Sequence, residues 1–181
     1  MGWVEDLEKN VDDIFGTTFN QRDGRKIPSS DDVALKDGAV KIEATFLYAD
    51  LAGSGDIADK CPWDTTAKII RAYLSCATRL MRAYGGEIRS FDGDRVMGVF
   101  MGDTMTSLAT DCAREIFWTT REIIQAKATA RFTSVKSNNV KIRQACGIDV
   151  GEVRAVRAGI RDLTASMKGR AHNQPNWPIN R

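Results

Sequence analysis

A strand-like pattern marks the region that leads to residue 50. Apolar residues occupy every second position, and the residues between them also become apolar close to Asp50. A run that becomes apolar on both faces is typical of a strand buried in a sheet. We therefore expect a buried strand over residues 40–50 that ends in a carboxylate. The alternating side chains on one face are Val40, Ile42, Ala44, Phe46 and Tyr48.

Helical spacing of apolar residues recurs in three other segments. Residues 3–15 predict a short amphipathic helix suited to packing or to dimer formation, and residues 106–127 predict a longer one. The helix between them ends at Gly85-Gly86, a pair that commonly stops a helix. Residues 16–38 are rich in Gly, Asp, Ser and Asn and predict an irregular connector. The apolar positions are Val4, Leu7, Val11 and Ile14; Ile70, Tyr73 or Leu74, Ala77, Leu80 or Met81 and Tyr84; and Leu108, Cys112, Ile116, Ile123 and Ile124.

Two further segments predict β-hairpins. Residues 87–91 and 95–100 flank the dipeptide Asp92-Gly93, which favours a two-residue turn with positive backbone angles. Asp94 is then expected to open the return strand. Residues 140–150 and 152–158 meet around Asp149 to Gly151, where we expect a second hairpin.

The order of these elements is strand, helix, hairpin, helix, hairpin. This βαββαβ order, with one strand to spare, predicts an α+β fold: a ferredoxin-like antiparallel sheet with helices on one face. A length of 181 residues suits one domain. We therefore divide the chain into an N-terminal helix and connector, residues 1–38, and a main domain, residues 39–181.

Charge and cysteine content exclude several function classes. Residues 121–170 carry 11 Lys or Arg against 4 Asp or Glu, and residues 1–60 carry 7 against 13. A basic half can bind polyphosphate as readily as nucleic acid, and without a run of adjacent basic residues we expect no nucleic-acid binding. Four scattered cysteines and a single histidine argue against a zinc site and a disulfide framework. With no apolar stretch long enough for a membrane span, the chain is expected to be cytoplasmic.

The expected topology brings two carboxylates to one edge of the sheet. Asp50 ends the first strand and Asp94 starts the strand that lies beside it. Mg²⁺ and Mn²⁺ are commonly held by one or two protein carboxylates together with substrate phosphates, and a pair of such ions can drive an in-line phosphoryl displacement. The small residues Ala52, Gly53 and Ser54 can present backbone N–H groups to a triphosphate. The alternative is structural: an Asp at a strand end often caps a turn, and Asp-Gly suits a hairpin.

The segments around these carboxylates resemble a known family. Phe46-Leu-Tyr-Ala-Asp-Leu-Ala-Gly-Ser54 and Gly85-Gly-Glu-Ile-Arg-Ser-Phe-Asp-Gly-Asp-Arg-Val-Met-Gly-Val-Phe100 are similar to the two metal-binding segments of class III nucleotide cyclase domains. The wording Tyr-Ala-Asp-Leu-Ala-Gly and Asp-Gly-Asp-Arg-Val-Met is most similar to the bacterial pyrimidine cyclases of the Pycsar antiphage systems. Gly147-Ile-Asp149 and Arg154-Ala-Val-Arg157 also resemble the next hairpin of that family. The resemblance covers residues 40–162.

This resemblance implies a site that is shared between two chains of a homodimer. It gives Asp50, Leu51 and Asp94 as ligands of two Mg²⁺ or Mn²⁺ ions, and the turn Ala52 to Ser54 as the phosphate-binding loop. It also implies that Asn173, which follows Gly169 at the family's spacing, steadies the ribose and the transition state. The last twenty or so residues are atypical, because Trp177 stands where the family has a phosphate-binding cation.

The base is expected to be a pyrimidine. Ser90 stands four residues before Asp94, where purine cyclases of the animal type carry Lys or Glu, so that device for reading purines is absent. We expect Tyr48 or Phe91 to narrow the base pocket, and Arg89 and Ser90 to supply its polar contacts.

The expected reaction converts UTP to 3′,5′-cyclic UMP and pyrophosphate, as a signal in antiphage defence. A cytidylate or adenylate cyclase, or a dimeric cyclase-like module without turnover, remain open alternatives. A diguanylate cyclase lacks its Gly-Gly-Asp-Glu-Phe signature here, and a palm-domain polymerase requires a longer chain.

Overall fold

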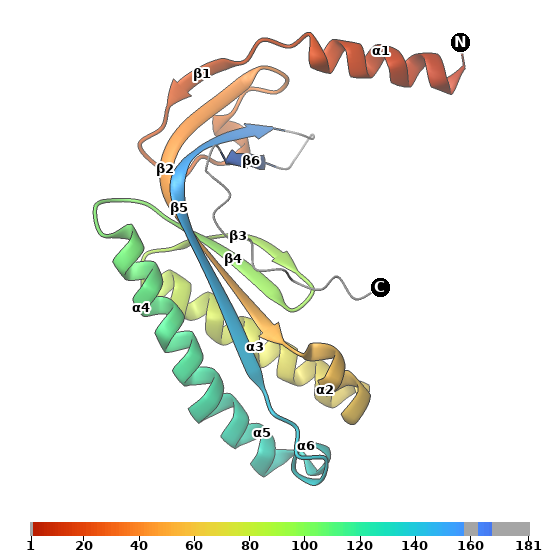
Figure 1. Cartoon of the computed structure of the whole chain (residues 1–181), viewed down its shortest axis with the longest axis vertical. Helices are drawn as coiled ribbons and strands as arrows, with labels where there is room; N and C mark the ends of the chain where they lie inside the picture. The colour runs from red at the N-terminus through yellow and green to blue at the C-terminus, as the bar shows by residue number, and fades with distance from the viewer. Residues whose placement is uncertain (1, 158–162, 168–181) are drawn as a thin grey trace. The chain divides into compact units, whose positions relative to one another are not determined.

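The computed structural model describes residues 2–157 and the strand over residues 163–167 (Figure 1). The described strands are β1 (Asn20–Asp23), β2 (Gly38–Ala52), β3 (Glu87–Asp92), β4 (Arg95–Phe100), β5 (Arg143–Arg157) and β6 (Leu163–Met167). The helices are α1 (Trp3–Phe15), η1 (Ser30–Asp32), α2 (Ser54–Lys60), α3 (Trp63–Ala83), α4 (Met105–Trp118), η2 (Thr119–Ile124), α5 (Gln125–Arg131) and α6 (Thr133–Ser137). No helix of this described part is long and apolar enough to cross a membrane.

The described chain forms two compact units. One comprises residues 44–150, and the other comprises residues 1–43 with residues from 151 onward. In the first unit the strand order is β3-β4-β2-β5, with β4 antiparallel to both β3 and β2. This is the order of a ferredoxin-like sheet, so the predicted fold class is confirmed.

The core of the larger unit lies between the sheet and the helices α3 and α4, which run side by side (Figure 1). Alternate residues of β2 enter this core, so one face of the strand is covered by helices. Tyr73 of α3 and Cys112 of α4 are fully buried against it. On β4, Gly98 packs so closely on α3 that an added Cβ would lie 2.9 Å from Sδ of Met81. The core residues from β2 are Leu47, Ala49 and Leu51.

The predicted helices are present, with longer or additional segments. α3 begins at Trp63 rather than near Ile70, and α2 precedes it after a break at Pro62. Periodicity missed α2 because only Ile57 of its seven residues is buried. The helix predicted over 106–127 continues through one π-helical segment, η2, to Arg131.

The hairpin predicted around residues 149–151 is wrong. β5 runs without interruption from Arg143 to Arg157, and its partner in the second unit is β6, with Val153 opposite Met167. The dipeptide that suggested a turn keeps strand geometry, since Gly151 is not among the described glycines with positive φ.

The predicted irregular connector contains one short strand. β1 pairs in parallel with β2, with Asn20 opposite Gly38. All four residues of β1 are exposed and polar, so they give no alternating signal that sequence analysis could detect. The helix predicted over residues 3–15 is confirmed as α1, and none of its residues is buried.

Candidate active site

The β3-β4 hairpin and β2 align the predicted site residues in two cross-strand rows. In the first row, Asp50 of β2 lies opposite Arg95 of β4, which lies opposite Asp92 of β3. In the second row, Tyr48 lies opposite Met97, which lies opposite Ser90.

Both rows are on the face of the sheet that points away from the helices. Tyr48 and Asp50 alternate along β2 with Leu47, Ala49 and Leu51, whose side chains fill the core beneath α3 and α4. Residues two apart on a strand are about 6.5–7 Å apart, so the two rows are neighbours on this open face.

Asp50 and Asp94 are brought to the same place on the sheet. The backbone N–H of Leu51 donates to the carbonyl oxygen of Asp94 at 3.3 Å, which joins the residue after Asp50 to the hairpin turn. The sequence predicted that the strand ends at Asp50. In the structure β2 continues to Ala52, and this hydrogen bond is made by Leu51, one residue beyond Asp50. Asp94 also differs from its predicted position, because the two turn residues are Gly93 and Asp94 rather than Asp92 and Gly93. Gly93 takes the positive φ of +59° that such a turn needs.

Arg95 is a member of the site that the sequence did not single out. Its Nε lies 3.3 Å from Oδ1 of Asp50, and the two side chains are 45% and 20% exposed. An arginine directly after an Asp-Gly-Asp turn was the available signal, since the cross-strand neighbour of a carboxylate is commonly a cation. The guanidinium occupies one side of the carboxylate that was predicted to bind a metal.

The phosphate-loop candidate has the backbone geometry of a tight turn. Gly53 has φ of +75° and precedes the first residue of α2, Ser54. An added Cβ at Gly53 would meet nothing within 4 Å, so the glycine is required for its backbone angle rather than for space. Because Leu51 is buried in the core, it can offer a metal only its carbonyl oxygen.

Arg89 and Phe91, two residues expected near the base, are placed differently on β3. A register shift between Ile88 and Ser90 sets Arg89 in a bulge, where its guanidinium pairs with Glu87 at 2.9 Å. Its Nε is buried without a hydrogen-bond partner among the described residues. Phe91 lies opposite Val96, a core residue, and is therefore on the helix side of the sheet. The expectation that Phe91 narrows a base pocket beside Tyr48 and Asp50 is wrong, because the pleat turns it to the opposite face.

A buried hydroxyl lies beneath the carboxylate pair. Tyr73 of α3 is fully buried, and its hydroxyl has no hydrogen-bond partner within the described part of the chain. Burial raises the pKa of Tyr73 far above its usual value, and the charges of Cys146, Asp50 and Asp94 raise it further. Both aspartates therefore add to the negative potential at one point of the core.

The donor set fits a metal that is shared with phosphate. Within residues 2–157 and 163–167, no group of three or more His, Cys, Asp or Glu side chains could hold an ion alone. Two neighbouring carboxylates without a third ligand suit Mg²⁺ or Mn²⁺, which complete their coordination with water and substrate oxygens. The prediction for Asn173, with Gly169 and Trp177, falls outside the described residues.

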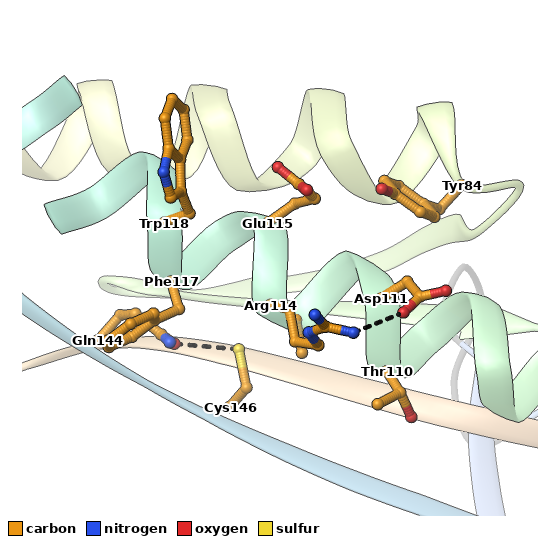
Figure 2. A pocket seen from close by; sticks show the side chains of 10 residues that line it. Tyr84, Thr110, Asp111, Arg114, Glu115, Phe117, Trp118, Gln144 and Cys146 are labelled. Carbon is orange, nitrogen blue, oxygen red and sulfur yellow. Dashed lines mark hydrogen bonds and ion pairs between the residues drawn. The ribbon is translucent and has the colours of Figure 1, made fainter. Parts of the chain in front are cut away.

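One cavity within the described residues is separate from these carboxylates. It has a volume of about 640 Å³ and lies along α4, where Phe117, Arg114 and Trp118 project around it (Figure 2). From β5, Gln144 accepts a hydrogen bond from Sγ of Cys146 at 3.0 Å. None of the residues in the two cross-strand rows lines this cavity.

Solved structures of nucleotide cyclases share this fold. A bacterial light-regulated adenylyl cyclase matches 74% of the chain and 38% of its own length with a TM-score of 0.62, at 21% identity. The adenylyl cyclase CyaB from P. aeruginosa matches 72% of the chain and 68% of its own length, with a TM-score of 0.61 and 19% identity. A dimeric guanylyl cyclase domain from the fungus Blastocladiella emersonii covers 71% of the chain and 69% of its own length, with a TM-score of 0.55 and 15% identity.

The sequence matches curated proteins more closely, although no family model matches it. It is 44% identical to the uridylate cyclase of Rhodovulum sp. (strain MB263) over 86% of the chain, but spans only 65% of that relative's length. It is 35% identical to the uridylate cyclase of Xanthomonas perforans over 89% of the chain and 69% of the relative. The resemblance to class III cyclases is thereby confirmed, and the chain belongs to the uridylate cyclase family.

Proposed function

We propose that the protein is a uridylate cyclase that converts UTP to 3′,5′-cyclic UMP and pyrophosphate. The observation that carries this proposal is the meeting of Asp50 with the turn that contains Asp94, at the end of the β2-β4 ladder. The similarity to two uridylate cyclases supports the choice of UTP. We further propose that residues 39–181 form the catalytic domain and residues 1–38 an N-terminal addition.

In this proposal Asp50 and Asp94 bind Mg²⁺ or Mn²⁺ together with the substrate phosphates. Such ions supply Lewis-acid activation of the attacking oxygen and stabilise charge on the leaving group. The 3′-oxygen of the ribose forms a bond to the α-phosphorus and loses its proton to the medium. The bond from the α-phosphorus to the bridging oxygen breaks, and pyrophosphate leaves with its electron pair. Backbone N–H groups of Ala52, Gly53 and Ser54 orient the triphosphate.

Arg95 neutralises Asp50 before substrate arrives. Its Nε lies 3.3 Å from Oδ1 of the carboxylate that binds the metal in this proposal, so the guanidinium competes with the metal for Asp50. The released guanidinium then has a negative triphosphate beside it. Arg95 therefore fits a dual role, first as a counter-ion of the aspartate and then as a phosphate contact.

The second cross-strand row supplies the base pocket. Tyr48, Met97 and Ser90 lie side by side, and Tyr48 is 38% exposed, so its ring has a free face for stacking. Ser90 offers a small hydroxyl that can hydrogen-bond a pyrimidine edge. Arg89, held by Glu87, lies next to this row and can contribute a further donor.

Two chains are needed to complete this site. The rows lie on an open sheet face, and a related fold is known in a dimeric guanylyl cyclase domain. We propose a homodimer with sites at the interface, in which Asn173 of one chain acts on the substrate of the other. The product serves as a signal in antiphage defence within the cytoplasm.

The direct test is to incubate the chain with each labelled nucleoside triphosphate and Mn²⁺, and then to identify cyclic products by mass spectrometry. Cyclic UMP is expected in excess over the other products. If cyclic CMP or cyclic AMP is the main product, the assignment of uracil as the base is wrong, and the assignment of cyclase activity stands. No cyclic product from any nucleotide would contradict the activity and favour a cyclase-like module without turnover.

A further inference from the structure

A groove of about 660 Å³ runs along the outer side of α3, on the face of the molecule that the proposed reaction does not use. Its apolar lining comes from Ile70 and Leu74 of the helix, and from Phe91 of β3 at its edge. Phe91 is 58% exposed there, although burial of a phenylalanine side chain is favourable in free energy. We call this surface the α3 groove.

Three arginines surround the α3 groove without a partner. Arg71, Arg79 and Arg82 line it, and none of them makes an ion pair or hydrogen bond with another residue in the described part of the chain. Six of the other eleven cations of the larger unit form ion pairs, as Lys60 does with Asp56 and Lys68 with Asp64. An apolar floor with an unpaired cationic rim fits an acidic amphipathic helix, which recognition grooves bind through apolar anchors at helical spacing.

The chain itself contains a helix of that chemistry. α1 has its apolar side chains on one stripe, and none of them is buried. It carries five carboxylates against one lysine, and of these Glu8 and Asp12 flank the stripe one turn apart. At 1.5 Å per residue, its 13 residues span about 20 Å. The groove from Ala67 to Arg82 spans about 22 Å by the same rise.

We propose that α1 of one copy of this chain binds in the α3 groove of a second copy. Exchange of the two helices about the two-fold axis of the proposed homodimer adds two equal contacts to that same dimer. The apolar stripe of α1 covers Ile70, Leu74 and Phe91, while its carboxylates pair with the arginine rim. The contact is independent of the cyclase reaction, and so its test needs no activity.

A charge exchange between two variants tests the proposal in the full chain. The first variant, Arg79→Glu with Arg82→Glu, makes the groove acidic and keeps α1 acidic. The second, Glu8→Lys with Asp12→Lys, makes α1 basic and keeps the groove basic. Each variant alone is expected to dimerise about tenfold more weakly in sedimentation equilibrium, because both of its contacts become repulsive. Mixed in equal amounts, they are expected to regain wild-type affinity, because both contacts of the mixed dimer join opposite charges.

Two matched controls accompany this experiment. Arg114→Glu reverses an exposed arginine on α4, and Asp6→Lys with Asp13→Lys reverses carboxylates on the other side of α1. Both are expected to dimerise like wild type, and circular dichroism reports that every variant is folded. Loss of affinity in the α1 variant alone would indicate that α1 pairs with α1, and would overturn the proposal. So would failure of the mixture to recover, or a wild-type chain that sediments as a monomer.

Discussion

Nε of Arg95 lies 3.3 Å from Oδ1 of Asp50, on the strand next to it. This pair places a cation at the carboxylate to which we assign a metal. The second proposed ligand, Asp94, directly precedes Arg95 in the chain. The ion pair therefore predicts how the site responds when either charge is removed.

Removal of either carboxylate should abolish turnover and leave the fold intact. In the proposed site, Asp50→Ala and Asp94→Ala each remove a metal ligand, and neither aspartate belongs to the buried core of the larger unit. We expect less than a few per cent of wild-type cyclic UMP formation, with a melting temperature equal to or above that of wild type. Substantial metal-dependent activity in both variants would contradict the two-metal assignment.

Removal of the competing guanidinium should affect metal binding and turnover in opposite directions. In Arg95→Gln, Asp50 has no counter-ion to release, so we expect Mn²⁺ to bind about threefold to tenfold more tightly in calorimetry without nucleotide. Turnover should fall, because a phosphate contact is lost. Arg114→Gln, which breaks an exposed pair with Asp111, is the control and should change neither quantity. Weaker Mn²⁺ binding in Arg95→Gln would refute the competition.

The base preference should depend on Tyr48 and not on Phe91. Tyr48→Ala removes the stacking surface of the second row, and we expect the ratio of kcat/KM for UTP over ATP to fall about tenfold. Phe91→Ala is an informative control because the two aromatics are on opposite faces of the sheet. An equal change in both variants would show that the effect is a general loss of packing.

Two thiols with raised pKa values, the buried Cys112 and the half-buried Cys146, predict a loss of stability in alkali. Burial raises the pKa of Cys112 and of Cys146 from 9.0 to about 12. The unfolded chain loses these protons above about pH 9, while the folded chain keeps them. The free energy of unfolding should therefore fall between pH 9 and pH 12, as urea titrations at successive pH values can measure. Cys112→Ala should reduce this slope, and at pH 8 the native thiol of Cys112 should react with a disulfide reagent far more slowly than it does in the unfolded chain.

The strands, and the approach of Asp50 to the hairpin turn, could be predicted where side-chain pattern decides the structure. β2, the β3-β4 hairpin and the pairing of Asp50 with the Asp94 turn all follow from apolar alternation and from one Asp-Gly dipeptide. The exact position of the turn does not, because a shift of one residue leaves the same composition at the turn. That shift decides whether Asp92 or Asp94 is a turn residue outside the ladder of paired strand residues.

Other features depended on contacts that a single sequence does not contain. The continuous β5 strand has turn-like residues at its centre, and Gly151 nevertheless keeps strand geometry within it. The orientation of Phe91 follows from the pleat once Val96 is known to face the core. Arg95 was overlooked because its role comes from a residue that is 45 positions away in sequence.

Gly98 gives the hairpin a mechanical connection to α3. With no side chain at this position, β4 lies directly on Met81, and so no compressible layer separates the strand from the helix. Arg95 lies three residues before Gly98 on the same strand, and Asp94 of the turn directly precedes Arg95. Any larger residue at this position requires either Met81 or β4 to move, and the turn that carries Asp94 would move with the strand.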